Sequence, residues 1–231
     1  MSAPASPTLA PAQGSAAESA VIFLHGYGSN GDDLIGLAPF FAQTLPKTVF
    51  YSPNAPEPWE GGFFGGRQWF TLAGYDPEAL RRQAGHMKGV YDRMFEGAVK
   101  ASAFLNTYID QTMAHHKLPA SKVALIGFSQ GTMMALHAGL RRAESLAAIV
   151  GFSGAMVGAS KLAAEIKSRP PVLLVHGEDD PVVPVEALPE IEKALKANNV
   201  PCDALTIPGL QHGIEQTGAL RAAAFLKSKL S

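Results

Sequence analysis

The chain has 231 residues, of which 47% are hydrophobic and 17% are charged, so it can bury a sizeable core and is too apolar to be a disordered chain. Its 19 basic and 20 acidic residues give a formal net charge of −1, which provides no electrostatic reason to expect nucleic acid or an anionic membrane as a partner. The single cysteine, Cys202, excludes an intramolecular disulfide and a thiolate metal cluster, and it fits a reducing cytoplasm.

The N-terminal residues 1–18, MSAPASPTLAPAQGSAAE, are rich in Ala, Pro and Ser. They contain no Lys or Arg and no continuous apolar run, so they make a poor signal peptide and cannot span a bilayer. A segment of this composition cannot bury enough surface to order itself. We therefore predict a flexible leader over 1–18 and a single folded domain over 19–231.

After the leader, short apolar runs alternate with helical patterns. Strands are predicted at 20–25, 48–52, 122–128, 146–152, 171–176 and 203–208. Helices are predicted up to residue 41 and at 77–117, 131–142, 185–198 and 215–229. Continuous apolar strands that alternate with helices are typical of a parallel sheet covered by helices on both faces. The sequence predicts one α/β domain, with no room for a large cap domain.

Ser129 lies in the stretch LIGFSQGTMM, where a strand-like run must turn directly into a helix. Gly127 and Gly131 flank it two positions away and remove Cβ atoms that would collide across so tight a turn. The turn would lift the serine hydroxyl clear of the sheet, at the strand ends where ligands bind in such folds. Serine also suits turns and helix caps, so a structural turn is the alternative. The strand-turn-helix context favours a nucleophile.

A serine nucleophile needs a base, and in this architecture the histidine follows the serine and the acid in the chain. Three histidines follow Ser129. His137 falls within the next helix, and His176 ends a strand, where a packing or turn role is expected. His212 lies on a loop between the last strand and the last helix, from which its side chain can reach back over the sheet. His212 is therefore the predicted base.

The acid that orients the histidine is expected in HGEDDPVVP, on the loop after the strand at 171–176. Pro181 has a fixed backbone angle and would hold the preceding carboxylate, Asp180, in one place. Asp179 is the alternative, with a solvated or capping role as its expected use. These considerations favour Asp180 as the acid.

An oxyanion that forms at Ser129 would need backbone donors. The first unpaired N–H of the following helix, that of Gln130, is one candidate. The second is the N–H of Tyr27 in the glycine-rich loop after the first strand, with His25 as a hydrogen-bond partner that braces this loop. The sequence has no H-E-x-x-H, paired cysteines or Walker lysine motif, so neither a metal nor a cofactor is expected.

The chain resembles the bacterial carboxylesterase, phospholipase and acyl-protein thioesterase family of α/β-hydrolases from about residue 20 onward. The motifs that carry the resemblance appear in the family's order and are VIFLHGYGSNGDDL, SPNAPEP, GRQWF, IGFSQGTMMAL, HGEDDPVVP and LQHGI. The resemblance implies an α/β-hydrolase fold and a triad of Ser129, Asp180 and His212. It also implies backbone donors at Tyr27 and Gln130, and it permits a homodimer.

The expected activity is that of a serine carboxylesterase acting through an acyl-enzyme on small to medium-chain esters, with thioesters and lysophospholipids as further substrates. A serine peptidase or amidase on the same scaffold, and a non-catalytic binding module, are the alternatives. The long segment after residue 52 has no periodicity and is typical of a binding loop or lid. Its apolar side chains would form an acyl groove or pack within the loop: Phe63, Phe64, Trp69, Phe70 and Leu72. We expect no stable membrane insertion.

Overall fold

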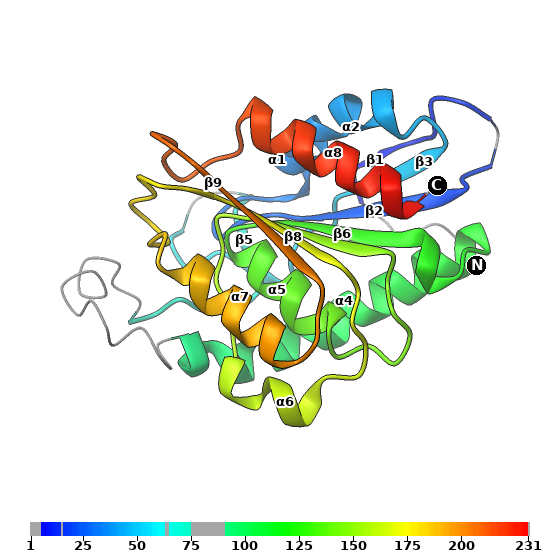
Figure 1. The fold of residues 1–231 in the computed structure, drawn as a ribbon. Coiled ribbons are helices and arrows are strands. Elements are labelled where there is room, and N and C mark those ends of the chain that lie inside the picture. The colour runs from blue at the N-terminus through cyan, green and yellow to red at the C-terminus, as the bar shows by residue number, and fades with distance from the viewer. Residues whose placement is uncertain (1–5, 15, 63–64, 75–90, 231) are drawn as a thin grey trace.

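A seven-stranded sheet runs through the middle of the molecule, with helices on both sides of it (Figure 1). The computed structural model describes residues 6–14, 16–62, 65–74 and 91–230. The strand order is β1-β3-β2-β6-β7-β8-β9, and every neighbouring pair is parallel except β1 with β3. The strands are β1 (Thr8–Leu9), β2 (Ser19–Leu24), β3 (Thr48–Tyr51), β6 (Val123–Phe128), β7 (Ala148–Phe152), β8 (Val172–Gly177) and β9 (Cys202–Ile207).

Both faces of the sheet are buried from β3 to β8, which explains why the strands of this part are mostly apolar runs, whereas the edge strand β9 is largely exposed. In β2, Ile22 and Leu24 join the core cluster that includes α4, α5 and α7, whereas Val21 and Phe23 join the cluster that includes α2 and α8. All four side chains are fully buried. The helices are α1 (Gly31–Leu34), α2 (Ala38–Thr44), α4 (Phe95–His116), α5 (Gln130–Gly139), α6 (Leu162–Glu165), α7 (Ala187–Ala197) and α8 (Gln216–Leu230). The predicted α/β architecture is confirmed.

The start of α5 is packed directly against the backbone of the sheet. Every residue of α5 is buried. A Cβ atom on Gly131 would lie 1.8 Å from the carbonyl oxygen of Leu24, and one on Gly127 would lie 2.4 Å from the carbonyl carbon of Gly131. Only glycine fits at these two positions, so the pair sets how closely the helix approaches β2 and β6.

The leader differs from its prediction, because part of it belongs to the sheet. Thr8 and Leu9 form β1, which pairs antiparallel with Tyr51 and Phe50 of β3. Without β1, β3 would end the sheet with unpaired backbone groups, and backbone pairing of this kind needs no apolar side chains. Composition alone therefore could not reveal it.

The segment after β3 also contains more structure than a loop. β4 (Glu57–Pro58) and β5 (Arg67–Gln68) form a small antiparallel pair. The short helix α6 was not predicted. The first part of the helix predicted at 77–117 lies outside the described residues, and α4 accounts for its second part.

Replacing Gly131 by alanine should strongly destabilise the fold, because the new methyl group would collide with the Leu24 carbonyl. We expect a loss of about 3 kcal/mol or more in the free energy of unfolding, measured by denaturant titration. Gly36→Ala is the matched control, since a Cβ there meets nothing within 4 Å. Equal stability of the two variants would contradict the packing described for α5.

Candidate active site

Ser129 stands between β6 and α5 in a strained backbone conformation. Its φ of 54° and ψ of −116° lie in a region that residues other than glycine rarely adopt. The surroundings hold it there: the Ser129 N–H donates to Phe152 O at 2.9 Å, and Ser129 O accepts from the N–H groups of Thr132 and Met133. Such strain costs about 1–3 kcal/mol and persists only where neighbouring contacts enforce it.

The Ser129 side chain remains available for chemistry. The residue is 8% exposed, and its hydroxyl makes no hydrogen bond to another described residue. It lies at the carboxyl edge of the sheet, by which we mean the edge where the parallel strands end. Ligands bind at this edge in folds of this type.

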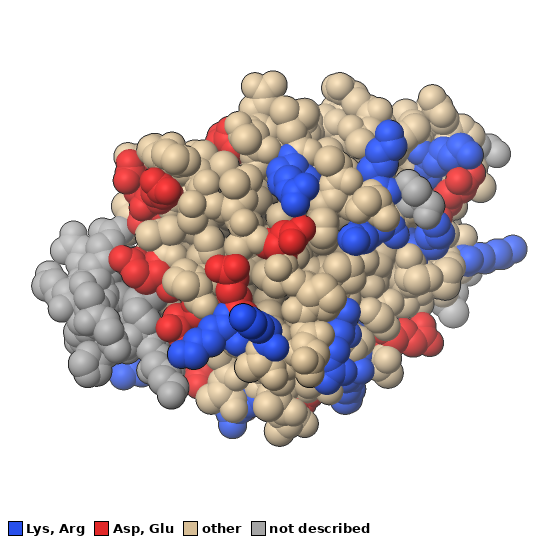
Figure 2. Space-filling model, viewed as in Figure 1, with Lys and Arg blue, Asp and Glu red and all other residues tan. Residues whose placement is uncertain are grey.

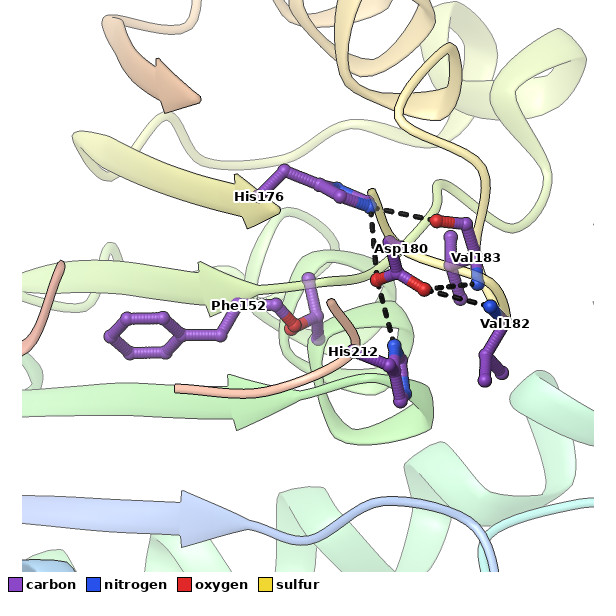
Figure 3. Close-up of polar contacts among 7 residues, drawn as sticks. Phe152, His176, Asp180, Val182, Val183 and His212 are labelled. Carbon is purple, nitrogen blue, oxygen red and sulfur yellow. Dashed lines mark hydrogen bonds and ion pairs between the residues drawn. The ribbon is translucent and has the colours of Figure 1, made fainter. Parts of the chain in front are cut away.

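Asp180 and His212, predicted to work together, are in direct contact (Figure 3). His212 Nδ1 lies 2.7 Å from Asp180 Oδ2. The other carboxylate oxygen of Asp180 accepts from the N–H groups of Val182 at 2.8 Å and Val183 at 2.9 Å. The Asp180 side chain is fully buried and that of His212 is 16% exposed. The carboxylate is thus fixed by its own loop while it holds the imidazole.

His176 also lies beside this carboxylate, a contact that the sequence analysis missed. Its Nε2 atom lies 2.9 Å from Val183 O and 3.4 Å from Asp180 Oδ2 (Figure 3). Burial alone would raise the pKa of Asp180, but the hydrogen bonds from His176 and His212, with that from the Val182 N–H, outweigh it and hold the pKa well below its usual range. Asp180 is therefore an ionised carboxylate at neutral pH.

The loop that carries His212 is laid over the end of β8. A Cβ on Gly177 would lie 2.2 Å from Leu210 O, and the Asp179 N–H donates to the same oxygen at 3.0 Å. The His212 ring also packs against that of Phe128, the residue before Ser129, with 4.8 Å between ring centroids. The structure brings His212 to the strand end that carries Ser129, whereas the side chain of Asp179 is exposed.

The loop after β2 approaches Ser129 closely. A Cβ on Gly26 would lie 3.4 Å from the Ser129 Cβ. The Gly26 carbonyl accepts hydrogen bonds from His25 Nδ1 at 2.8 Å and from the Ser29 N–H at 3.3 Å. In a trans peptide the N–H points opposite to the carbonyl, so these bonds fix the direction of the Tyr27 N–H. That N–H donates no hydrogen bond within the described residues.

His25 is fixed as well, as a brace for this loop. Its Nε2 accepts from the Ala55 N–H at 3.0 Å, which leaves the proton on Nδ1 for the Gly26 carbonyl. Burial lowers the pKa of His25, partly countered by the hydrogen bond to Gly26. The ring is therefore neutral near pH 7, as this bonding pattern requires.

Gln130 contributes to the site with its side chain, which the sequence analysis did not anticipate. Its Oε1 accepts from the Trp69 N–H at 2.9 Å and its Nε2 donates to Phe70 O at 2.7 Å. The residue is fully buried. Its own N–H, as the first of α5, has no partner within the helix. Gln130 thus ties the start of α5 to the segment after β5.

The predicted groove residues are found in different surroundings. Trp69 and Phe70 are 1% and 2% exposed and lie in the core, and Trp69 Nε1 donates to His25 O. Leu72 is partly buried against the same core cluster. Trp69 and Phe70 therefore pack in the core and do not line an open groove. Phe63 and Phe64 lie outside the described residues.

Glu60 connects the Tyr27 loop with the segment that holds Leu72. Its carboxylate accepts hydrogen bonds from the Tyr27 hydroxyl, from Thr71 Oγ1 at 2.7 Å and from the Leu72 N–H at 3.2 Å. Burial and the bond to Glu60 raise the pKa of Tyr27 to about 12, so the phenol keeps its proton. No sequence motif indicates this arrangement.

The described residues show neither a metal-binding cluster nor a membrane-spanning helix. Within the described ranges, no group of three or more His, Cys, Asp and Glu side chains is placed to bind a metal ion. Of the helices in those ranges, none has the length and apolarity needed to cross a membrane.

Replacing Gln130 by methionine should leave the buried Trp69 N–H and Phe70 carbonyl without partners. We expect a loss of about 2–4 kcal/mol in the free energy of unfolding, by denaturant titration, since each unsatisfied buried group costs about 1–3 kcal/mol. Gln211→Met at an exposed glutamine is the control and should change stability by less than about 0.5 kcal/mol. A Gln130 variant as stable as the control would refute the bridging role.

Known proteins resemble this chain in sequence and in overall fold. The family model described as phospholipase/carboxylesterase matches residues 10–230. Acyl-protein thioesterase 1 of Gibberella zeae is 28% identical over 221 residues, which cover 91% of this chain and 90% of that protein. Esterase YpfH of Escherichia coli strain K12 is 27% identical over 183 residues, covering 78% and 69%.

Solved structures extend the comparison to three dimensions. The crystal structure of esterase PE8 has a TM-score of 0.86 at 39% identity and covers 97% of this chain and 98% of that one. Acyl-protein thioesterase 2 of Zea mays, at 23% identity, has the same fold with a TM-score of 0.77, covering 98% and 99%. This chain therefore belongs to the phospholipase/carboxylesterase family of α/β-hydrolases and is a carboxylic ester hydrolase.

Proposed function

We propose that the protein is a serine carboxylesterase that hydrolyses small to medium-chain esters through an acyl-enzyme intermediate. Ser129 is the nucleophile, His212 the general base and Asp180 the acid that orients it. One observation carries the assignment: a buried carboxylate, held by two backbone N–H groups, binds the imidazole of His212, which packs against Phe128, the residue before the strained Ser129.

In the first step the Ser129 hydroxyl attacks the ester carbonyl carbon, and His212 takes its proton. Because Nδ1 of His212 donates to Asp180, Nε2 is the nitrogen left to accept that proton. The ionised Asp180 stabilises the imidazolium that forms. The N–H groups of Tyr27 and Gln130 donate to the oxyanion of the tetrahedral intermediate.

The intermediate then collapses to the acyl-enzyme. The bond to the alcohol oxygen breaks, and the imidazolium of His212 donates its proton to the leaving alcohol. Water enters, loses a proton to His212 and attacks the acyl carbon. The bond between the acyl carbon and Ser129 Oγ then breaks, and the imidazolium of His212 returns its proton to Oγ, which releases the carboxylic acid and regenerates Ser129. The protein groups used in these steps are side chains and backbone N–H groups of this one chain.

The comparisons with known proteins bear on the substrate range. Relatives named as acyl-protein thioesterases support thioesters as additional substrates, and the family's description supports lysophospholipids. We place the acyl chain beside Leu72, on the side of Ser129 where the segment after β5 is tied to the Tyr27 loop. Phe63 and Phe64 remain predicted members of this surface, whereas Trp69 and Phe70 support it from the core.

Ser129→Ala should abolish labelling by a fluorophosphonate probe and reduce kcat for nitrophenyl esters by about 10³-fold or more. Ser153→Ala is the matched control, because Ser153 directly follows the neighbouring strand β7, as Ser129 follows β6, and also has a positive φ, 46°. The control should keep its label. Labelling that survives in Ser129→Ala, or is absent from the wild type, would disprove the assignment of Ser129 as the nucleophile.

A chain-length series of the same esters measures the acyl preference. Amide hydrolysis at rates matching those of the esters would favour the peptidase alternative.

Asp180→Asn should lower kcat by about 10³- to 10⁴-fold, because an amide cannot stabilise the imidazolium and can hold the ring in the wrong tautomer. Asp179→Asn, which changes the same chemical group one residue away at an exposed position, should change kcat by less than about threefold. Steady-state kinetics on a nitrophenyl ester compares them. If only the Asp179 variant lost activity, the acid would be misassigned.

A further inference from the structure

The chain is nearly neutral, but its acidic and basic residues are concentrated at opposite edges of the sheet. In the described segments that run from the end of a parallel strand into the first turn of the next helix, acidic residues predominate. These residues, with the buried Asp180 left out, are Asp32, Asp33, Glu57, Glu60, Asp92, Glu96, Glu178, Asp179, Glu186, Glu190 and Glu215, with Glu165 in the four-residue helix α6. The same segments contain three basic residues, Arg67, Arg93 and Lys161.

The opposite edge of the sheet carries the reverse charge. The described segments that lead from the last turn of a helix into the next strand, or to the end of α8, contain the basic residues Lys47, Lys117, Lys122, Arg141, Arg142, Lys167, Arg169, Lys196, Lys227 and Lys229. Acidic residues in or beside them are Glu18, Glu144 and Glu165. On the face drawn in Figure 2, acidic side chains are concentrated toward the left, where α7 and α8 begin, and basic ones lie mostly in the middle and to the right.

Helix ends account for part of this pattern. The N-terminus of a helix carries roughly +0.5 charge and its C-terminus roughly −0.5, so acids and bases at these ends stabilise the helices. Glu215, for example, accepts from the N–H groups of Thr217 and Gly218 at the start of α8. The partial charge of a helix end is smaller than a full carboxylate charge and fades within one turn, so an excess of negative charge remains.

Two of the three basic residues on the acidic side contact neutral groups of the protein and keep their positive charge. Arg67 donates to the carbonyls of Ala55 and Pro56, and Lys161 lies over the Phe95 ring at 4.9 Å. In contrast, Glu178 and Glu186 are exposed and belong to the same connection between β8 and α7 as Asp180. The connection from β8 to α7, which is described throughout, thus contains four carboxylates and no Lys or Arg.

We propose that this carboxyl edge selects substrates by charge, favouring neutral and cationic esters and rejecting those with an anionic alcohol or acyl group. The inference rests on the function proposed above. A cleft lined by one sign of charge changes association rates of charged ligands by about 10- to 10³-fold, and salt screens the effect. The same field assists release of the product, because hydrolysis turns a neutral acyl group into a carboxylate anion.

The test compares three butyrate esters whose alcohols match in size: choline (cationic), 3,3-dimethylbutanol (neutral) and 2-hydroxyethanesulfonate (anionic). Their intrinsic reactivities differ, so the measured quantity is how the cationic-to-anionic ratio of kcat/KM changes between conditions and variants. For the wild type we expect this ratio to fall by about tenfold between low salt and 0.5 M NaCl, as screening shortens the range of the field. The rate of the neutral ester should change little.

A pair of charge-matched variants locates the effect. Glu178→Gln/Glu186→Gln removes two carboxylates beside the site, and Glu18→Gln/Glu144→Gln removes two from the opposite edge. At low salt the first should lower the ratio by about threefold or more, and the second should keep it within about twofold of the wild type. Both should hydrolyse the neutral ester as the wild type does.

If the cationic-to-anionic ratio of kcat/KM changed neither with salt nor with the Glu178/Glu186 substitutions, the proposed charge selection would be overturned and the esterase proposal would remain intact. An equal response to the two variant pairs would also overturn it, since the effect would then come from net charge alone. A wild type that hydrolyses neither the neutral ester nor nitrophenyl esters would overturn the proposed function, and this inference with it.

Discussion

The contact between the first turn of α5 and the backbone of β2 governs the rest of the architecture. Gly131 lies so close to the Leu24 carbonyl that the helix cannot move inward, and moving it outward would loosen the packing of the core cluster to which α5 belongs. Only one residue, Ser129, separates β6 from α5, and the closeness of the two elements forces its positive φ. The strain at the serine is therefore a result of helix-to-sheet packing, and the whole core maintains it.

The groups around Ser129 come from distant parts of the chain and are held mainly by backbone contacts. His25 fixes the peptide before Tyr27 through a carbonyl, and Asp180 fixes its own loop through two N–H groups. The Gln130 side chain hydrogen-bonds the backbone N–H of Trp69 and the backbone carbonyl of Phe70. Because these bonds are short and buried, the site needs little rearrangement when a substrate arrives, which is how preorganised dipoles favour a transition state.

The sequence was sufficient for the parallel strands, for the helices other than α6 and for the contact between Asp180 and His212, since these depend on local periodicity and on the order of loops at one edge. Three polar contacts were missed: the local contact of His176 with Asp180, and the long-range contacts of the Gln130 side chain with the Trp69 N–H and of Glu60 with Tyr27. Each depends on the three-dimensional approach of ordinary residues that form no motif. Hydrophobicity also failed to separate core from groove, because Trp69 would be equally apolar in either place.

The two residues of β1 cover a strand edge that could otherwise pair with other molecules. They occupy backbone groups of Phe50 and Tyr51 in β3, a strand whose residues are all buried. A protease that trimmed the Ala/Pro/Ser-rich segment would bare a flat, hydrophobic strand with unpaired amides and carbonyls, the kind of template that recruits strands from other molecules. The pairing of β1 with β3 thus covers a strand that would otherwise form the edge of the sheet.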